Sequence, residues 1–331
     1  MSVIKQDLEY LTSEALKLGF ANKSFLVTGA TGMIGRMLVE TLKRITKENN
    51  VIVLGINLKE AEEVYGGTKL VRSSFDSLNK IEQDVDFIIH LASPTNSRYM
   101  VEHAVETIDF IYSGTKQILD FALKHNSKVL YISSMEVYGE VLDSKLKTEN
   151  DLGEISLLNR RSSYPEAKRL CELLCYSYNQ QYGLPVCCAR LAQTFGGGTI
   201  KNDPRVFGYM ARCAINGESI VLNTKGDSYG NYCYLADTIN AFFYILSNGI
   251  DGETYNVVGD NCRCTILEMA NLVANTIFKK SIKVEIQINN SGLYPNPTKL
   301  NMDNQKIKSI GWTPKYDLPD MFRRMILSWQ E

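Results

Sequence analysis

One glycine-rich stretch gives the strongest indication of the fold: Val27-Thr28-Gly29-Ala30-Thr31-Gly32-Met33-Ile34-Gly35. It follows an apolar run and opens a helical pattern that begins near Met33. Glycines at such a strand-to-helix turn permit a tight bend and let a pyrophosphate reach the backbone, while the helix N-terminus supplies unpaired N–H groups. Because it stands at the first such turn of the chain, it predicts dinucleotide binding rather than a purely structural turn. The expected cofactor contacts are Gly29, Thr31, Gly32, Met33, Ile34 and Gly35.

The choice of dinucleotide depends on the next strand. In this kind of motif an acidic residue about twenty positions later usually binds the ribose hydroxyls of NAD. Here Gly55, Ile56 and Asn57 stand in that region, and no arginine replaces the acid to meet the 2′-phosphate of NADP, although Lys59 is near. These residues leave the choice between NAD and NADP open; NAD is the cofactor that we expect, and NADP is not excluded.

The first 190 residues alternate short β-branched runs with stretches of helical period, such as Ile34, Leu38, Leu42 and Ile45. Continuous apolar strands separated by helices are typical of a parallel sheet covered on both faces. The predicted fold class is therefore α/β: a Rossmann-like, doubly wound parallel sheet with a smaller α/β C-terminal substrate lobe. The expected strands are Phe25–Thr28, Val51–Leu54, Lys69–Val71, Phe87–Ala92, Lys128–Ser133 and Pro185–Leu191.

The texture of the chain changes after Gln193, where glycines and prolines break it into short pieces. We expect a dinucleotide-binding domain over residues 1–192 and about 232–250, and a substrate-binding lobe over 193–231 and 251–331. The stretch Tyr232–Ser247 is assigned to the first domain, because an apolar strand followed by a helical pattern suits its sheet.

Composition argues against several classes of protein. The 331 residues carry 36 Lys plus Arg against 37 Asp plus Glu, a net charge of −1, which disfavours a nucleic-acid-binding surface. No apolar run reaches about 18 residues, the length of a membrane span. Acidic residues interrupt the first twenty, which predict a short amphipathic helix and no secretory signal. Eight scattered cysteines do not suggest a disulfide scaffold, and Cys262-Arg263-Cys264 lacks a nearby histidine for a metal site. We expect a cytoplasmic protein without a metal.

A tyrosine and a lysine stand one helical turn apart in Ser163-Tyr164-Pro165-Glu166 and Lys168. We interpret Ser163 as the helix N-cap and Glu166 as the residue that completes a capping box. Lys168 then shares a face with Tyr164, and its charge is expected to lower the phenol pKa from about 10 toward the working pH. Such a tyrosine can exchange a proton with a sugar hydroxyl while a hydride moves to or from a nicotinamide. A surface pair without function is the alternative, and the upstream glycine-rich stretch favours the catalytic interpretation.

A second polar cluster ends the expected strand Lys128–Ser133: Ser133, Ser134 and Glu136. Open α/β sheets bind ligands at the carboxyl ends of their strands, so these side chains are expected to face the cofactor crevice. Ser134 can hydrogen-bond a substrate oxygen, and Glu136 can act as a base for a carbon acid next to a carbonyl. The alternative is that the serines cap the next turn and that Glu136 is solvated.

Taken in order, these motifs resemble the extended short-chain dehydrogenase/reductases that modify nucleotide sugars, the epimerase/dehydratase group. The likeness covers about residues 23–316 and is strongest to the UDP-glucuronate decarboxylase branch. It rests on Thr28–Gly35, His90–Pro94, Ser133–Gly139, Tyr164–Arg169, Arg190 with Phe195-Gly196, Asp203 with Arg205-Val206, Tyr234–Asp237, Thr265–Glu268 and Ile310–Pro314.

The resemblance implies a nucleotide sugar that is oxidised at C4 to a 4-keto sugar, in the setting of surface-polysaccharide precursor synthesis. Tyr164 is then the phenolate base, Lys168 binds the cofactor ribose and Ser134 hydrogen-bonds O4. A homodimer is implied through the helix around 100–124 and the helix that begins near Tyr164. Further cofactor contacts are implied for Asp76, Leu91, Ala92, Ser93, Ser133, Tyr164 and Lys168. Substrate contacts are implied for Ser93, Ser134, Gln193, Lys201, Arg205 and Lys299.

The chain departs from the family pattern where the exact reaction is decided. Met135-Glu136 stands in place of the Asp-Glu of dehydratases and the Ser-Glu of decarboxylases. Gly230-Asn231 stands where most members have an arginine for the diphosphate, and Gln193 and Lys299 replace an asparagine and a second arginine. Because epimerisation needs the least machinery, we favour a nucleotide-sugar epimerase. The alternatives, in order, are a dehydratase or decarboxylase that uses Glu136 as base, an NADPH-dependent 4-ketoreductase, and a non-catalytic cofactor-binding protein.

Overall fold

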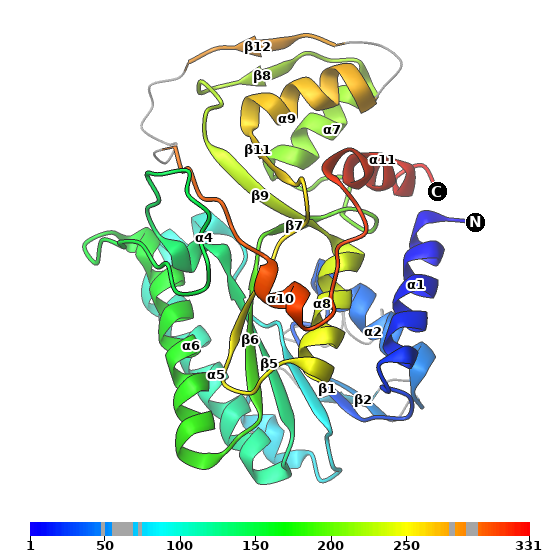
Figure 1. Ribbon diagram of the computed structural model, residues 1–331, viewed down its shortest axis with the longest axis vertical. Coiled ribbons are helices and arrows are strands. Elements are labelled where there is room, and N and C mark those ends of the chain that lie inside the picture. The colour runs from blue at the N-terminus through cyan, green and yellow to red at the C-terminus, as the bar shows by residue number, and fades with distance from the viewer. Residues whose placement is uncertain (48–49, 55–68, 72–74, 278–281, 289–296) are drawn as a thin grey trace.

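The structure, a computed structural model, describes residues 1–47, 50–54, 69–71, 75–277, 282–288 and 297–331. Its centre is a seven-stranded sheet, within the described residues, in the order β10-β6-β5-β4-β1-β2-β3, and every neighbouring pair is parallel (Figure 1). The predicted Rossmann-like sheet is thereby confirmed. Its strands are β1 (Phe25–Thr28), β2 (Val51–Leu54), β3 (Lys69–Val71), β4 (Phe87–His90), β5 (Lys128–Ser134), β6 (Val186–Leu191) and β10 (Thr254–Val257).

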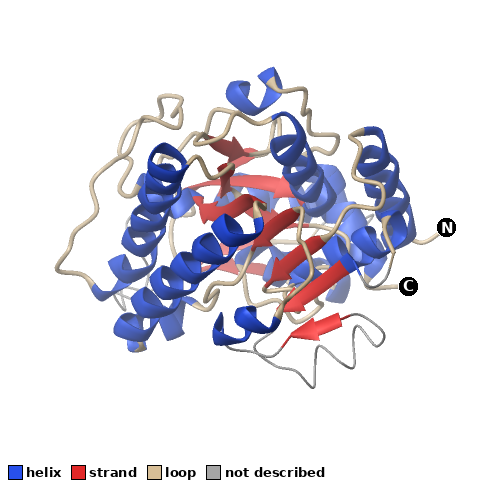
Figure 2. Cartoon of the chain, turned by 90° about the horizontal axis from the view of Figure 1, so that it is seen from below, coloured by secondary structure: helices blue, strands red, loops and turns tan. Residues whose placement is uncertain are grey.

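Helices cover both faces of this sheet, which Figure 2 shows from below. On one face α5 (Ala104–His125) and α6 (Ser163–Tyr182) pack against each other and against β5. On the other face lie α2 (Met33–Ile45) and α8 (Leu235–Asn248), and α1 (Val3–Lys17) packs on both of them. Successive strand side chains point to opposite faces and enter two separate apolar clusters. The short amphipathic helix predicted at the N-terminus is α1.

A smaller lobe lies at the top of Figure 1. It contains a three-stranded sheet in the order β11-β9-β7 and a two-stranded sheet of β12 and β8, flanked by α7, α9 and α11. The short helix α4 (Ser97–Glu102) follows β4, and α10 (Gln305–Ser309) packs near β10. The lobe elements are β7 (Gln193–Phe195), α7 (Val206–Asn216), β8 (Ile220–Leu222), β9 (Tyr229–Tyr234), β11 (Arg263–Thr265), α9 (Ile266–Leu272), β12 (Val284–Ile286) and α11 (Leu318–Ser328).

One sequence expectation about the sheet is wrong. The strand at Tyr232 does not join the seven-stranded sheet, because β9 pairs with β7 and β11 in the smaller lobe. The helix that follows it, α8, does cover the large sheet, and the edge position beside β6 is taken by β10. The domain boundaries drawn from the sequence stay a prediction.

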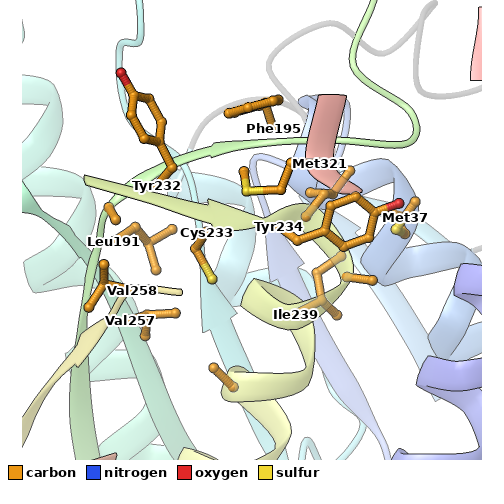
Figure 3. Close-up of a cluster of buried hydrophobic side chains, with 14 of the residues drawn as sticks. Met37, Leu191, Phe195, Tyr232, Cys233, Tyr234, Ile239, Val257, Val258 and Met321 are labelled. Carbon is orange, nitrogen blue, oxygen red and sulfur yellow. The ribbon is translucent and has the colours of Figure 1, made fainter. Parts of the chain in front are cut away.

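The two lobes share one apolar core (Figure 3). Met37 of α2 and Ile239 of α8 come from the large domain, and Phe195, Tyr234 and Met321 come from the elements of the smaller lobe. Because this cluster is continuous, the lobe packs directly on the helices that cover the large sheet.

Within the described residues no helix is long and apolar enough to cross a membrane. That part of the chain also contains no group of three or more His, Cys, Asp and Glu side chains arranged to hold a metal ion. The cysteines are free thiols, and seven of the eight are buried.

Candidate active site

The glycine-rich loop joins β1 to α2 at the switch point of the sheet, since β1 pairs with β2 on one side and β4 on the other. Gly29 has a φ of +68°, and a Cβ there would lie 2.8 Å from the Ala92 nitrogen. A Cβ on Gly35 would lie 2.5 Å from the Gly29 carbonyl oxygen. Gly32 begins α2 without a side-chain cap, which leaves first-turn N–H groups for an anion. The loop therefore fits the pyrophosphate of NAD, which Thr31, Met33 and Ile34 would border.

The predicted cofactor residues Leu91, Ala92 and Ser93 are fixed beside this loop by His90. The Thr28 hydroxyl lies 2.7 Å from His90 Nδ1 and accepts a hydrogen bond from the Ala92 nitrogen over 3.0 Å. Burial, assisted by the charge of Lys168, lowers the pKa of His90 to about 3. His90 is thus a neutral core histidine that ties β1 to β4.

Tyr164 lies in the first turn of α6, within the reach of two serine hydroxyls. Burial and the charge of Glu136 raise the pKa of Tyr164 to about 12, while Ser134, Arg161 and Ser93 lower it. Apart from the Tyr164 phenol, the buried Ser93 hydroxyl has no hydrogen-bond partner among the described residues. A buried hydroxyl with bonding capacity left beside a phenol is a natural contact for a ligand oxygen.

Lys168 is buried, and the pKa of its neighbour Tyr164 moves in the direction opposite to the one expected of the pair. Its Nζ donates to the Ile132 carbonyl oxygen over 2.8 Å and lies 5.7 Å from the centre of the Tyr164 ring. Burial lowers the pKa of Lys168 to about 8. The expected lowering of the Tyr164 pKa below 10 is wrong for the protein alone, because burial of the phenol outweighs the groups that favour the phenolate.

The start of α6 also differs from the expected capping box. Ser163 is the first helical residue, and Ser162 occupies the N-cap position without a side-chain cap. The Ser163 hydroxyl donates to the Met100 carbonyl oxygen over 3.2 Å, and Glu166 pairs with Arg169 at 3.3 Å. Tertiary partners therefore replace the local cap and attach α6 to α4.

The two serines at the end of β5 have different partners. The Ser133 hydroxyl donates over 2.5 Å to Glu172, whose carboxylate pairs with Arg190 at 2.7 Å. The Ser134 hydroxyl accepts a hydrogen bond from the Glu136 nitrogen over 3.2 Å and lies near Tyr164. Ser134 is therefore placed to meet a substrate oxygen, whereas the Ser133 side chain is already engaged.

The carboxylate of Glu136 is paired with Arg161, a residue that is not among the site residues predicted from the sequence. Arg161 Nη2 lies 2.7 Å and 2.6 Å from the two Glu136 oxygens, and its Cζ lies 5.9 Å from the Tyr164 ring centre. Arg161 Nη1 is buried without a hydrogen-bond partner in the described part of the chain. No local spacing pointed to Arg161, because it lies in the short 3-10 helix Arg160–Ser162 that precedes α6, and its partner Glu136 is 25 residues away.

The predicted substrate residues of the smaller lobe are less tightly grouped. Gln193 is half-buried in β7, whereas Lys201 and Lys299 are exposed. Arg205 is paired with Asp203 at 2.6 Å, and its Nη2 lies 3.8 Å from the sulfur of Met33. Among the described residues, neither lysine side chain makes a hydrogen bond or ion pair. The structure thus brings Arg205 to the glycine loop but does not join the lysines to Tyr164.

At Gly230, where the family usually has an arginine, the side chain of Tyr232 occupies the space that a side chain would need. A Cβ on Gly230 would collide with the phenol of Tyr232, which is folded back over the glycine. The Tyr232 hydroxyl is buried and has no partner in the described ranges. Across the sheet, Arg263 pairs in register with Asn231 and stacks at 3.6 Å on the Tyr229 ring. The side chain of Asp76, like Gly55, Ile56, Asn57 and Lys59, lies outside the described residues.

A cavity of about 510 Å³ opens beside Ser93. Its walls come from the segment after β4, from α4 and from α5, and Ser93 is the predicted site residue among them. The lining residues are Ser93, Pro94, Thr95, Asn96, Arg98, Tyr99, Glu102 and Phe110.

A dinucleotide loop at the switch point, with a buried Tyr–Lys pair at the neighbouring strand ends, defines an enzyme of the short-chain dehydrogenase/reductase class. The family model described as the NAD dependent epimerase/dehydratase family matches residues 25–258, and the chain belongs to this family. Its members act as epimerases, dehydratases and decarboxylases on nucleotide sugars.

Similar proteins agree with this assignment. UDP-glucuronic acid decarboxylase 6 of Arabidopsis thaliana is 29% identical over 90% of this chain and 86% of its own length. UDP-glucuronic acid decarboxylase 1 of Danio rerio is 27% identical over 92% of this chain and 72% of its length. The solved UDP-N-acetylglucosamine 4-epimerase of Methanobrevibacter ruminantium has a TM-score of 0.80 at 21% identity, covering 94% of this chain and 99% of that chain. The NAD-bound dTDP-glucose 4,6-dehydratase DesIV of Streptomyces venezuelae has a TM-score of 0.75 at 20% identity, covering 93% and 97%. These two structures share the fold.

Proposed function

We propose that the protein is a nucleotide-sugar epimerase that acts through a 4-keto sugar and keeps one NAD bound throughout turnover. The main support for this proposal is the ion pair that Glu136 forms with Arg161. Both of its carboxylate oxygens lie within hydrogen-bond distance of Arg161, so it is not a free base. Ser134, Tyr164 and Lys168 are complete, and epimerisation at C4 needs no further acid or base.

The residues of this chain then divide the work as follows. Tyr164 takes the proton of the C4 hydroxyl and returns it at the end, and Ser134 and Ser93 hydrogen-bond the same oxygen. Lys168, held by the Ile132 carbonyl, is placed to bind the cofactor ribose. When bound, NAD supplies the acceptor for the C4 hydride and a positive ring that favours the phenolate. We propose that the keto sugar turns to present its other face in the cavity beside Ser93, the site residue that lines it.

A second candidate function is decarboxylation of a nucleotide-linked uronic acid, which the UDP-glucuronic acid decarboxylases among the relatives favour. The carboxylate of a 4-keto uronate is β to the ketone. It can leave as CO₂ while its bonding electrons form an enolate that is protonated at C5. This step requires no base to remove a C5 proton, so the ion pair of Glu136 does not oppose it.

The test is product analysis by NMR after incubation with UDP-glucose and, separately, UDP-glucuronic acid, each with added NAD. Inversion at C4 without loss of carbon supports the epimerase, and release of CO₂ supports the second candidate. Tyr164→Phe should lose about 10²–10⁴-fold in turnover, the usual contribution of a general acid–base. Glu136→Gln should leave C4 inversion largely intact. Full activity in Tyr164→Phe would overturn both functions.

We propose that the expected homodimer forms through the outer faces of α5 and α6. The two helices pack side by side and expose apolar residues that a monomer would leave in water. The exposed apolar residues include Val105, Ile108, Tyr112, Leu170, Leu173 and Tyr176.

We also propose a cytoplasmic location and a role in polysaccharide precursor synthesis. Free thiols throughout the chain suit a reducing compartment.

A further inference from the structure

The first and last helices of the chain meet next to the turn that follows β7, and both termini lie on the same side in Figures 1 and 2. The first helix, α1, precedes the residues matched by the family and packs on α11 as well as on α2 and α8. The Val3 nitrogen donates over 2.7 Å to Glu331 Oε1. The two ends of the chain are therefore joined directly.

A buried carboxylate closes this junction. Asp7 of α1 is fully buried, and it accepts hydrogen bonds from Arg324 Nη2 over 2.7 Å and from the Tyr234 hydroxyl over 2.5 Å. Arg324 Nε also donates to the Tyr234 hydroxyl oxygen over 2.9 Å. Removing one member of a buried ion pair leaves the other charge uncompensated, so the three residues act as a unit. We call Asp7, Tyr234 and Arg324 the terminal clasp.

The terminal clasp holds the turn Gly196-Gly197-Gly198-Thr199. The Gly197 nitrogen donates to the Tyr234 hydroxyl over 3.3 Å, and a Cβ on Gly197 would lie 2.9 Å from both that oxygen and Asp7 Oδ2. This close approach explains why a glycine stands there. From the C-terminal side, Trp329 Nε1 donates to the Thr199 carbonyl oxygen over 2.6 Å.

The same turn also contacts the start of α2. The Thr199 hydroxyl is buried and donates to the sulfur of Met33 over 3.4 Å, the same sulfur that Arg205 approaches. Met33 is the first residue of α2 and borders the loop that would hold the pyrophosphate. We infer that the terminal clasp positions this turn against Met33 and so slows the release of NAD, which makes Asp7 and Tyr234 positioning residues. The inference rests on the proposed function only in placing NAD at residues 29–35.

The test measures how fast bound NAD exchanges with labelled NAD, using Tyr234→Phe. This variant keeps the packed ring and the Asp7–Arg324 pair but removes the oxygen that holds the Gly197 nitrogen. Of the three hydrogen bonds that the hydroxyl makes, only the one from the Gly197 nitrogen reaches the turn. We therefore expect about fivefold faster NAD exchange, the worth of that one bond, and faster amide exchange at residues 196–199. Asp7→Asn should have a larger effect, and Glu9→Gln on the exposed face of α1 is the matched control with no effect.

The results separate the inference from the proposed function. NAD exchange in Tyr234→Phe within twofold of the wild type, with unchanged amide exchange in the turn, would overturn the inference and leave the function standing. A wild-type protein that binds neither NAD nor NADP would overturn both. A loss of thermal stability in Asp7→Asn with unaltered NAD exchange would reduce the clasp to a structural contact and also overturn the inference.

Discussion

Replacing Arg161 by methionine should move the pH dependence of turnover, because this guanidinium pairs with Glu136 and lies near Tyr164. Its Cζ lies 5.9 Å from the Tyr164 ring centre, and 33% of the side chain is exposed, so its field is partly screened. With an effective dielectric constant of about 50, Coulomb's law gives about 1 kcal/mol at this distance. That energy corresponds to a change of about 0.8 in the pKa of the phenol.

The sign follows from the charge that remains. Without Arg161, the nearby carboxylate of Glu136 acts on Tyr164 uncompensated, and it already raises the pKa of that phenol. Because the phenolate is the active form, the ascending limb of the profile of kcat/KM against pH should move to higher pH. At a fixed pH on that limb, kcat/KM should fall about sixfold and recover as the pH rises.

The assay is the pH profile of kcat/KM for whichever of UDP-glucose and UDP-glucuronic acid is converted. Arg160→Met is the matched control, since Arg160 is exposed and its side chain makes no hydrogen bond or ion pair among the described residues. Adding Glu136→Gln to Arg161→Met should return the limb toward its original position. An unmoved limb in Arg161→Met, or an equal movement in Arg160→Met, would refute this reasoning.

Three further changes test the surroundings of the site. Gly35→Ala places a Cβ 2.5 Å from the backbone, so it should weaken NAD binding and lower the free energy of unfolding, measured by urea titration, by about 1–3 kcal/mol. Gly32→Ala is the control: its Cβ would lie 3.4 Å from the nearest atom, and the variant should fold normally. Because the unfolded chain takes up a proton near pH 6.5 and the buried His90 ring does so only near 3, His90 should lower the free energy of unfolding as the pH falls through this range, by at most about 1.4 kcal/mol per pH unit. In His90→Asn this contribution to the slope of unfolding free energy against pH should vanish. A slope unchanged from the wild type would contradict the expectation. Leu173→Glu, at a side chain that is 61% exposed on α6, should convert the proposed dimer to a monomer in sedimentation velocity, and a persisting dimer would move the interface elsewhere.

The sequence could predict the parts of the fold that carry a local signal. The glycine-rich stretch and the apolar runs gave β1 to β6, and the spacing of Tyr164 and Lys168 gave the pair on α6. The edge strand β10 was not predicted, because Thr254–Val257 is short and includes a buried asparagine. Its place in the sheet is set by pairing with β6, which no local pattern shows. The aromatic stretch of β9 looked like a strand of the large sheet, but its partners are β7 and β11.

Electrostatics were the least predictable part of the site. The raised pKa of Tyr164 depends on burial and on Glu136, which is 28 residues away in sequence. The pairs Glu136–Arg161 and Asp7–Arg324 likewise join residues that only the folded chain brings together. No local spacing reports such contacts.

The proposed cycle on one bound NAD is tested by denaturing the purified protein and identifying any released nucleotide by mass spectrometry. We expect close to one NAD per chain, retained through purification, because the cofactor is reduced and reoxidised within each turnover. A protein that is empty as purified and then takes up NADPH in preference to NAD would contradict the proposed cycle and would instead support a net 4-ketoreductase.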